Sequence, residues 1–326
     1  DSVAGDDLYL SIDADLQMAT YLALQNEIAA IVYSNIKSGE IPINDVYTAL
    51  IGNSVINTEH FSKSKASDTE KSVLSVFKSR QKTTLGKIKQ ELTSSPEALN
   101  TMSDEVLDEF TYIISMLKDD QVLLKNEIDT SDSVYQKWKD QKISPKEYLN
   151  YCITQHWIDI SQLNVDEKYA DSTEVYDALC KYILKNIKTD TEFSKIIYQY
   201  MITRGEISPR QLCLILFDQG VLDYDDATVN KLKNGSLSPR DFLMKKIYNI
   251  EITPAQLALE PCTGSCVVTD EKTGEIRAMV SYPGYNSNKL ANGVDSEYFA
   301  SLQHDKSSPL LNYATQQKTA PGSTFK

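Results

Sequence analysis

The chain has 326 residues, and its 46 acidic against 33 basic residues give a formal net charge of −13. A surface this acidic repels phosphate, so the composition argues against general nucleic-acid binding. Glycine (12) and proline (10) are scarce, which argues against an all-β fold built on tight turns and favours helices. The length predicts about two domains, and no apolar run approaches the roughly 20 residues that a membrane-spanning helix needs.

The N-terminal segment predicts a short strand followed by a helix. Residues 8–12 alternate enough for a strand. Asp13 then offers a helix N-cap, and an apolar stripe continues at helical spacing. We therefore expect a helix from about Ala14 to 34–37, ended near Gly39.

Residues 38–259 are predicted to be almost entirely helical. The evidence is a series of helix-start signals in which a capping side chain precedes an apolar periodic segment, often with proline at the first helical position. The segment 62–90, rich in lysine and serine, is predicted to be flexible or solvated. The capping residues are Ser144, Asp171, Thr189, Ser208, Ser238 and Thr253.

The character changes to β after Pro261. Residues 264–270 and 275–282 read as strands and residues 271–274 as the turn between them, which predicts a β-hairpin. Lys272-Thr273-Gly274 lies at this turn, and we interpret it as turn chemistry that uses a positive φ at glycine. An irregular stretch follows, and a new helix is predicted to begin at the end of the chain.

Ser323 and Lys326 are the candidate catalytic residues. Ser-x-x-Lys at a helix N-terminus is a known way to build an acylating serine. The spacing of three places the amine on the same helical face as the hydroxyl, where an amine of lowered pKa can take the hydroxyl proton. The helix dipole and the first free backbone N–H groups favour the oxyanion that forms during acyl transfer.

The bare Ser-x-x-Lys pattern is not specific, because it occurs at five other places, the first at a predicted helix end and the other four in ordinary polar sequence. At those places, exposed serine and lysine side chains explain it. The Pro-Gly turn immediately before Ser323, the aromatic Phe325 and the hairpin upstream distinguish the last match. The other matches are Ser34–Lys37, Ser62–Lys65, Ser75–Lys78, Ser79–Lys82 and Ser115–Lys118.

Neither a metal site nor a cofactor site is predicted. The five cysteines are an odd number scattered along the chain, and the three histidines form no ligand motif. Only Cys262 and Cys266 lie close together, without the usual ligand spacing. The redox state of the cysteines stays open.

Both ends of the chain resemble the class B penicillin-binding protein transpeptidase domain. The resemblance implies a mainly α fold, in which a large helical insertion is nested in an incomplete α/β penicillin-binding transpeptidase-like domain. It divides the chain into the first strand and helix (1–37), the helical insertion (38–259) and the continued transpeptidase domain (260–326). The matching residues, in family order, are 10–17, 267–270, 273–276, 278–283, Asn312, Ala314 and 321–326.

The resemblance also implies a function. Ser323 would attack the D-Ala-D-Ala carbonyl of a peptidoglycan stem peptide, with Lys326 as general base and the Ser323 N–H as one oxyanion donor. The acyl-enzyme would pass to an amine of a neighbouring stem peptide, or be trapped by a β-lactam antibiotic. The resemblance places the protein on the outer face of the bacterial cytoplasmic membrane, with a membrane anchor expected upstream of Asp1.

The family's Ser-x-Asn and catalytic Lys-Thr-Gly motifs would follow the nucleophile, and the chain ends before both. We therefore expect these 326 residues alone to be inactive. Two alternatives stay open. The helical middle could be a protein–protein interaction module that binds a partner in the cell-wall synthesis machinery, or the chain could be a β-lactam-sensing relative. The block 278–283 and the Pro-Gly before Ser323 favour the transpeptidase.

Overall fold

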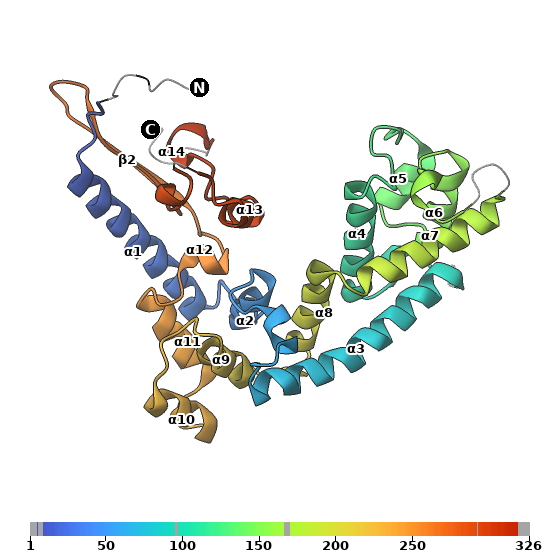
Figure 1. Ribbon diagram of the computed structural model, residues 1–326, viewed down its shortest axis with the longest axis horizontal. Coiled ribbons are helices and arrows are strands. Elements are labelled where there is room, and N and C mark those ends of the chain that lie inside the picture. Colours follow the sequence, from blue (N-terminus) through green and yellow to red (C-terminus); the bar gives the residue numbers. More distant parts are fainter. Residues whose placement is uncertain (1–4, 6–8, 95–96, 166–169, 292, 319–326) are drawn as a thin grey trace. The chain divides into compact units, whose positions relative to one another are not determined.

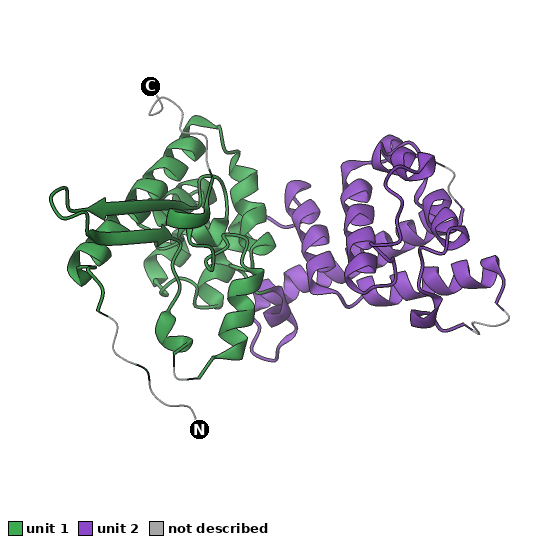
Figure 2. Ribbon diagram, turned by 90° about the horizontal axis from the view of Figure 1, so that it is seen from above, with its two compact units in different colours: residues 1–57, 209–326 green, residues 58–208 purple. Residues whose placement is uncertain are grey.

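The structure is a computed structural model, and it describes residue 5 and residues 9–94, 97–165, 170–291 and 293–318. The chain divides into two compact units, shown in Figure 2: unit 1 contains residues 1–57 and 209–326, and unit 2 contains residues 58–208. The described residues are mainly helical with one two-stranded sheet, which confirms the predicted mainly α fold (Figure 1). Among them, no helix is both long enough and apolar enough to cross a membrane.

Unit 1 joins the two ends of the chain to part of its middle. Its elements are α1 (Ala14–Ser38), α2 (Ile43–Gly52), α9 (Pro209–Asp218), α10 (Asp226–Asn234), α11 (Pro239–Tyr248), α12 (Pro254–Leu257), β1 (Gly264–Thr269), β2 (Ile276–Tyr282), a 3₁₀ turn (Ser287–Lys289), α13 (Ser296–His304) and α14 (Tyr313–Gln316).

The regular elements of unit 2 in its described residues are helices, apart from one isolated β-bridge between Leu123 and Ile158. Its elements are a 3₁₀ turn (Thr58–Ser62), α3 (Asp68–Thr93), a 3₁₀ turn (Leu99–Thr101), α4 (Asp104–Asp119), α5 (Ser133–Lys139), α6 (Pro145–Thr154), a 3₁₀ turn (Ile160–Gln162), α7 (Ser172–Ile187) and α8 (Thr191–Thr203).

The compact units have different boundaries from the segments predicted from the sequence. Residues 38–57 and 209–259, expected in the helical insertion, belong to unit 1. They pack on α1, where the rings of Tyr33 and Tyr248 meet edge to face at 5.1 Å between centroids. Compactness does not show which residues were inserted into a family domain, so the division at residues 37 and 259 stays a prediction.

The first helix forms as predicted, whereas the strand before it does not. The Asp13 carboxylate accepts the N–H of Leu16 at 3.0 Å, and Gly39 ends α1 in the left-handed region with φ +88°. The described residues 9–12 have no regular structure. Ser11 reaches the hairpin through its hydroxyl, which donates to the Ile276 carbonyl at 2.8 Å. The Asp13 N–H also donates to the Arg277 carbonyl at 2.9 Å, so the segment contacts β2 without forming a strand ladder.

The predicted hairpin is confirmed. β1 and β2 pair antiparallel, with Gly264 opposite Tyr282 and an irregularity in the register near Thr269. At the turn, the Asp270 carboxylate accepts the N–H groups of Lys272 and Thr273, and these bonds lower the pKa of Asp270. Gly274 has φ +76°. Lys272-Thr273-Gly274 is therefore a turn, as interpreted from the sequence.

Most of the predicted helix starts are confirmed. Such a start is marked by a side chain that accepts a hydrogen bond from a backbone N–H in the first turn of the helix. At α12 the capping box is reciprocal, with Thr253 and Gln256 each accepting the other's backbone N–H. α8 starts one residue later than predicted, since Asp190, and not Thr189, accepts the N–H of Phe193. The confirmed starts follow Ser144, Asp171, Ser208, Ser238 and Thr253.

The segment 62–90 is predicted to be flexible or solvated, and its residues 68–90 form most of α3, a regular helix whose five lysines in this stretch are exposed. Ser67 and Glu70 make a reciprocal capping box at its start. Glu70 is fully buried, and its carboxylate also lies 2.7 Å from His60 Nδ1. The buried positions along α3 recur at helical spacing, so one face of a lysine-rich helix belongs to the core of unit 2.

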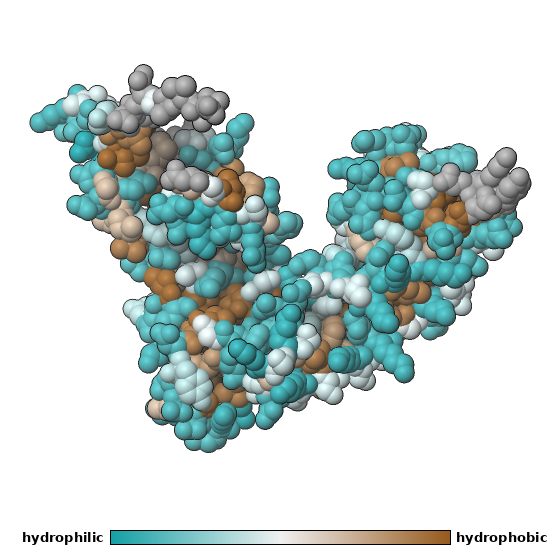
Figure 3. All heavy atoms as spheres, in the orientation of Figure 1, coloured by the Kyte–Doolittle hydropathy of each residue, from teal (hydrophilic) through white to brown (hydrophobic). Residues whose placement is uncertain are grey.

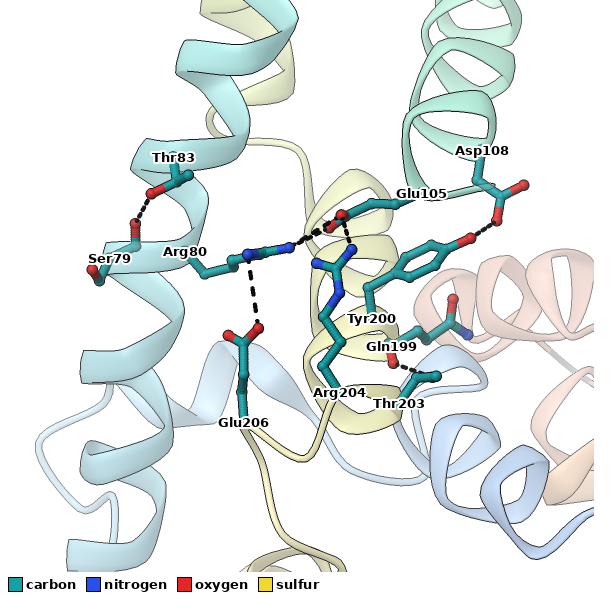
Figure 4. A network of polar contacts seen from close by, with 10 residues as sticks. All are labelled: Ser79, Arg80, Thr83, Glu105, Asp108, Gln199, Tyr200, Thr203, Arg204 and Glu206. Carbon is teal, nitrogen blue, oxygen red and sulfur yellow. Dashed lines mark hydrogen bonds and ion pairs between the residues drawn. The ribbon is translucent and has the colours of Figure 1, made fainter. Parts of the chain in front are cut away.

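A network of charged side chains joins three helices of unit 2 (Figure 4). Glu105 of α4 accepts Arg80 Nη2 of α3 through both carboxylate oxygens at 3.1 Å, and it accepts Arg204 Nη2 at 2.5 Å, just past the end of α8. Arg80 also lies 3.8 Å from Glu206. A carboxylate shared by two guanidinium groups fixes these helices against one another.

Candidate active site

The N-terminal helix and the hairpin are joined by one glutamine. Gln17 Nε2 donates to the Met279 carbonyl at 2.6 Å, and the Met279 N–H donates to Gln17 Oε1 at 2.8 Å. The side-chain amide therefore satisfies both backbone groups of one β2 residue, as a hydrogen-bonded residue of a neighbouring strand would. The two residues are 262 positions apart in the chain. This contact brings together the two regions that carry the family resemblance.

Replacing Gln17 by alanine is expected to loosen α1 from β2. The Met279 N–H and carbonyl would lose both partners, at a cost of about 1–3 kcal/mol. Hydrogen exchange followed by mass spectrometry measures this effect, and the β2 amides should exchange faster. Gln303→Ala on the exposed surface of α13 is the control and should leave the β2 amides unchanged. Equal protection of β2 in the wild type and in Gln17→Ala would contradict the assigned role.

Close packing reinforces the contact between α1 and the hairpin. A Cβ added at Gly264 would lie 3.1 Å from Ile28 Cδ1, so the start of β1 lies directly against the helix. Tyr282 is buried, with its ring 5.7 Å from that of Tyr21. Burial raises the pKa of Tyr282, so its hydroxyl stays neutral and accepts the Ala255 N–H at 3.5 Å.

The segment before the predicted Ser-x-x-Lys motif is fastened to β2. Ser281 Oγ donates to Asn312 Oδ1 and accepts the N–H of Ala314, both at 3.3 Å. Tyr313 Oη donates to the Ser307 carbonyl at 2.8 Å. Asn312 and Ala314 are among the residues that carry the family resemblance, and Ser281 belongs to the block 278–283. The structure therefore brings these separate parts of the resemblance into contact.

A pocket of about 860 Å³ lies between α1, β2 and the loops that follow β2. Figure 3 shows apolar surface over the part of unit 1 where α1 lies. Met18 and Tyr285, which line the pocket, are 59% and 47% exposed. The apolar and aromatic side chains on its walls include Met18, Tyr21, Met279, Tyr285, Tyr298 and Leu310.

Ser323 and Lys326 lie outside the described residues, which end at Lys318. Their pairing as nucleophile and base stays a prediction. Cys262 is a buried free thiol, and burial, together with the Glu260 carboxylate, raises its pKa to about 11. In the described part of the chain, no group of three or more histidine, cysteine, aspartate or glutamate side chains could hold a metal ion.

The family described as penicillin binding protein transpeptidase domain matches residues 264–326. These residues are a penicillin-binding protein transpeptidase region. Within the described residues, this transpeptidase region contains the hairpin, α13 and α14. It is held to α1 by Gln17 and Gly264, as described above.

Curated relatives agree with this assignment. The chain is 45% identical over 69 residues to peptidoglycan D,D-transpeptidase PbpA of Mycolicibacterium smegmatis, covering 20% of this chain and 14% of that protein. It is 35% identical over 86 residues to peptidoglycan D,D-transpeptidase MrdA of Acinetobacter baumannii, covering 26% and 13%. It is 43% identical over 60 residues to MrdA of Escherichia coli K12, covering 18% and 10%. The matches thus span only a small part of each relative, and no solved structure matches the chain.

Proposed function

We propose that this chain is part of a peptidoglycan D,D-transpeptidase that works through an acylated serine. The observation that carries the proposal is the match of residues 264–326, which includes Ser323 and Lys326 in Pro-Gly-Ser-Thr-Phe-Lys. The relatives that match this region are named peptidoglycan D,D-transpeptidases. The proposed substrates are peptidoglycan stem peptides, and the proposed site of action is the outer face of the bacterial cytoplasmic membrane.

In the proposed reaction, Lys326 takes the proton of Ser323 Oγ as this oxygen bonds to the D-Ala-D-Ala carbonyl carbon. The resulting oxyanion is stabilised by the Ser323 N–H at the helix N-terminus. The peptide C–N bond then breaks, and the terminal D-alanine leaves with the proton returned by the lysine. An amine of a second stem peptide then bonds to the acyl carbon while the ester bond to Ser323 Oγ breaks. The proton that the amine loses passes through Lys326 to Oγ, which forms the cross-link and regenerates the serine. A β-lactam acylates the same oxygen through opening of its ring.

The described structure supports this proposal through the scaffold that precedes the motif. Ser281 on β2 binds Asn312 and Ala314, which fixes the chain shortly before Pro321-Gly322-Ser323. Gln17 in turn fixes β2 to α1. A nucleophile needs placement within a fraction of an ångström of its productive position, and such placement needs a rigid support.

Labelling with a fluorescent penicillin tests the proposal in the whole protein in which this sequence occurs. We expect a covalent label that Ser323→Ala abolishes, whereas Lys326→Ala slows acylation by about 10²–10⁴-fold. Ser79→Ala is the matched control, because Ser79–Lys82 has the same spacing on the exposed surface of α3, and it should label normally. An unlabelled wild type, or a Ser323→Ala variant that labels like the wild type, would overturn the proposal.

A further inference from the structure

One stretch of this acidic protein is strongly basic. Residues 71–90 contain five lysines and one arginine and no acidic residue, in a chain with a net charge of −13. All of them lie in α3. Arg80 is engaged with Glu105 and Glu206 inside unit 2, so the remaining cations of this run are lysines.

Three of these lysines line a groove of about 500 Å³ between α3 and the C-terminal end of α7. Lys78, Lys82 and Lys89 are spaced i, i+4, i+11 along α3, so they share one face of the helix over about 16 Å. Lys188 adds a fourth cation from the other side, and Leu85 lies among them. All four lysines are exposed, and in the described part of the chain none of them forms an ion pair.

The groove has a defined, apolar floor. Leu85, Gly86 and Leu184 lie between the lysines, and both leucines are half-buried. Gln81 Nε2 donates to the Lys188 carbonyl at 3.1 Å, which ties the end of α7 to α3. Two acids lie two residues from a groove lysine. Asp190, near Lys188, is occupied by the N–H of Phe193 and the hydroxyl of Tyr112. Glu91, near Lys89, has a buried Oε2 without a hydrogen-bond partner among the described residues. Among the described residues, the four exposed groove lysines therefore have no carboxylate as an ion-pair partner.

We propose that this groove binds an extended, base-free phosphodiester polymer, that is, a chain of polyol phosphates. A row of cations about 16 Å long fits a linear chain of repeated negative charges better than a single anion. The cations are all lysines, which bind phosphate as point charges, whereas defined carboxylate recognition favours the planar fork of arginine.

The apolar floor of the groove favours a polyol phosphate chain over the two other phosphodiester ligands, nucleic acid and a membrane surface. Single-stranded nucleic acid binds in basic grooves whose aromatic side chains stack on the bases. The residues that line this groove include no aromatic side chain. A membrane surface would instead call for apolar side chains that protrude beyond the basic ones. In this groove the apolar side chains, Leu85 and Leu184, are half-buried at the floor, and the lysines are exposed. This site is independent of the serine chemistry proposed above, so either can fail without the other.

Binding of the full chain to a synthetic poly(glycerol phosphate) of about ten phosphates, longer than the lysine row, tests the proposal. We expect binding that weakens steeply between about 50 and 200 mM salt. Changing Lys78, Lys82, Lys89 and Lys188 together to glutamine should weaken binding at least about tenfold and reduce the salt slope by about three.

The matched control makes the same change in net charge elsewhere on unit 2. Lys63, Lys65, Lys125 and Lys137 are exposed, and their joint replacement by glutamine should alter binding by less than about threefold, because distant charges are screened. An oligonucleotide of equal charge and anionic vesicles should bind more weakly than the polymer. Equal loss in the two fourfold variants, or tighter binding to the oligonucleotide or vesicles, would overturn the proposal.

A single substitution tests the same groove without removing lysines. A Cβ added at Gly86 would meet no atom within 4 Å, so a side chain can be accommodated there. Gly86→Glu should weaken polymer binding several-fold, whereas Gly86→Gln, which has the same shape without the charge, should bind within about twofold of the wild type. Equal binding of these two variants would also overturn the proposal, whatever the folding of the fourfold variant.

Discussion

Replacing Glu105 by glutamine is expected to destabilise unit 2 by about 3–5 kcal/mol. Glu105 is 3% exposed and holds Arg80 and Arg204 together (Figure 4). The amide keeps the shape of the carboxylate, but it cannot offset two guanidinium charges, and its N–H₂ group points a donor at other donors. Arg204 would then lose its counter-charge, and Arg80 would keep only Glu206, at 3.8 Å.

Tryptophan fluorescence during urea unfolding measures this effect, because both tryptophans of the chain lie in unit 2. Trp138 stacks on Tyr148 at 4.4 Å between ring centroids, and Trp157 is 5% exposed, so both report on packing. Glu192→Gln is the control. It removes an ion pair with Lys195 in which the glutamate side chain is 57% exposed, and it should cost less than about 1 kcal/mol. Similar unfolding midpoints for the two variants would contradict a central role for Glu105.

The helix starts of this chain could be predicted because their causes are local. A cap and its partner are three residues apart, so Ser144 or Thr253 can be recognised without any knowledge of the fold. At α8 two neighbouring side chains, Thr189 and Asp190, could both cap the helix, and the prediction took the wrong one. α3 was missed because its lysines and serines hide a sparse apolar spacing, of which Val73 and Phe77 are the first members.

The contacts that build the candidate site could not be predicted by the same means. Gln17 and Met279 are 262 positions apart, and no periodicity links them. Only the family resemblance indicated that the two ends belong together. For Ser281, the sequence contained no pattern that predicts its contacts with Asn312 and Ala314, apart from its place in the block 278–283. The groove lysines did leave a signal, the absence of any acid in residues 71–90, but a charge run alone does not show which helix face it occupies.

The stability of unit 2 is expected to fall as the pH rises from about 5 to 8, and Glu109 is the cause. Glu109 is 1% exposed, and its Oε1 has no hydrogen-bond partner among the described residues. Burial raises the pKa of Glu109 to about 8, and the nearby carboxylates Glu105 and Asp108 raise it further, whereas Lys87 and Arg80 act in the opposite direction. At neutral pH the folded protein therefore keeps this carboxyl mostly protonated.

The direction of this pH dependence follows from the protonation of Glu109 in the folded and in the unfolded state. Below about pH 4 Glu109 is protonated both folded and unfolded, so it contributes no pH dependence. Above that value the unfolded chain loses the proton of Glu109, while the folded chain keeps it until about pH 8. Each increase in pH over this range therefore favours the unfolded state. The full effect is on the order of 5 kcal/mol. Acidification from pH 8 toward 5 should therefore stabilise unit 2 through this residue.

Glu109→Gln should remove this dependence, because the amide resembles the protonated carboxyl and has no charged form. The variant should be more stable than the wild type at pH 8 and similar to it near pH 5, as measured by urea unfolding with tryptophan fluorescence at each pH. Glu127→Gln, at an exposed position, is the control and should follow the wild-type curve. A Glu109→Gln curve parallel to the wild type would show that Glu109 ionises normally in the folded protein. Glu105 raises the pKa of Glu109. The fall of stability with rising pH should therefore begin at a lower pH in Glu105→Gln than in the wild type.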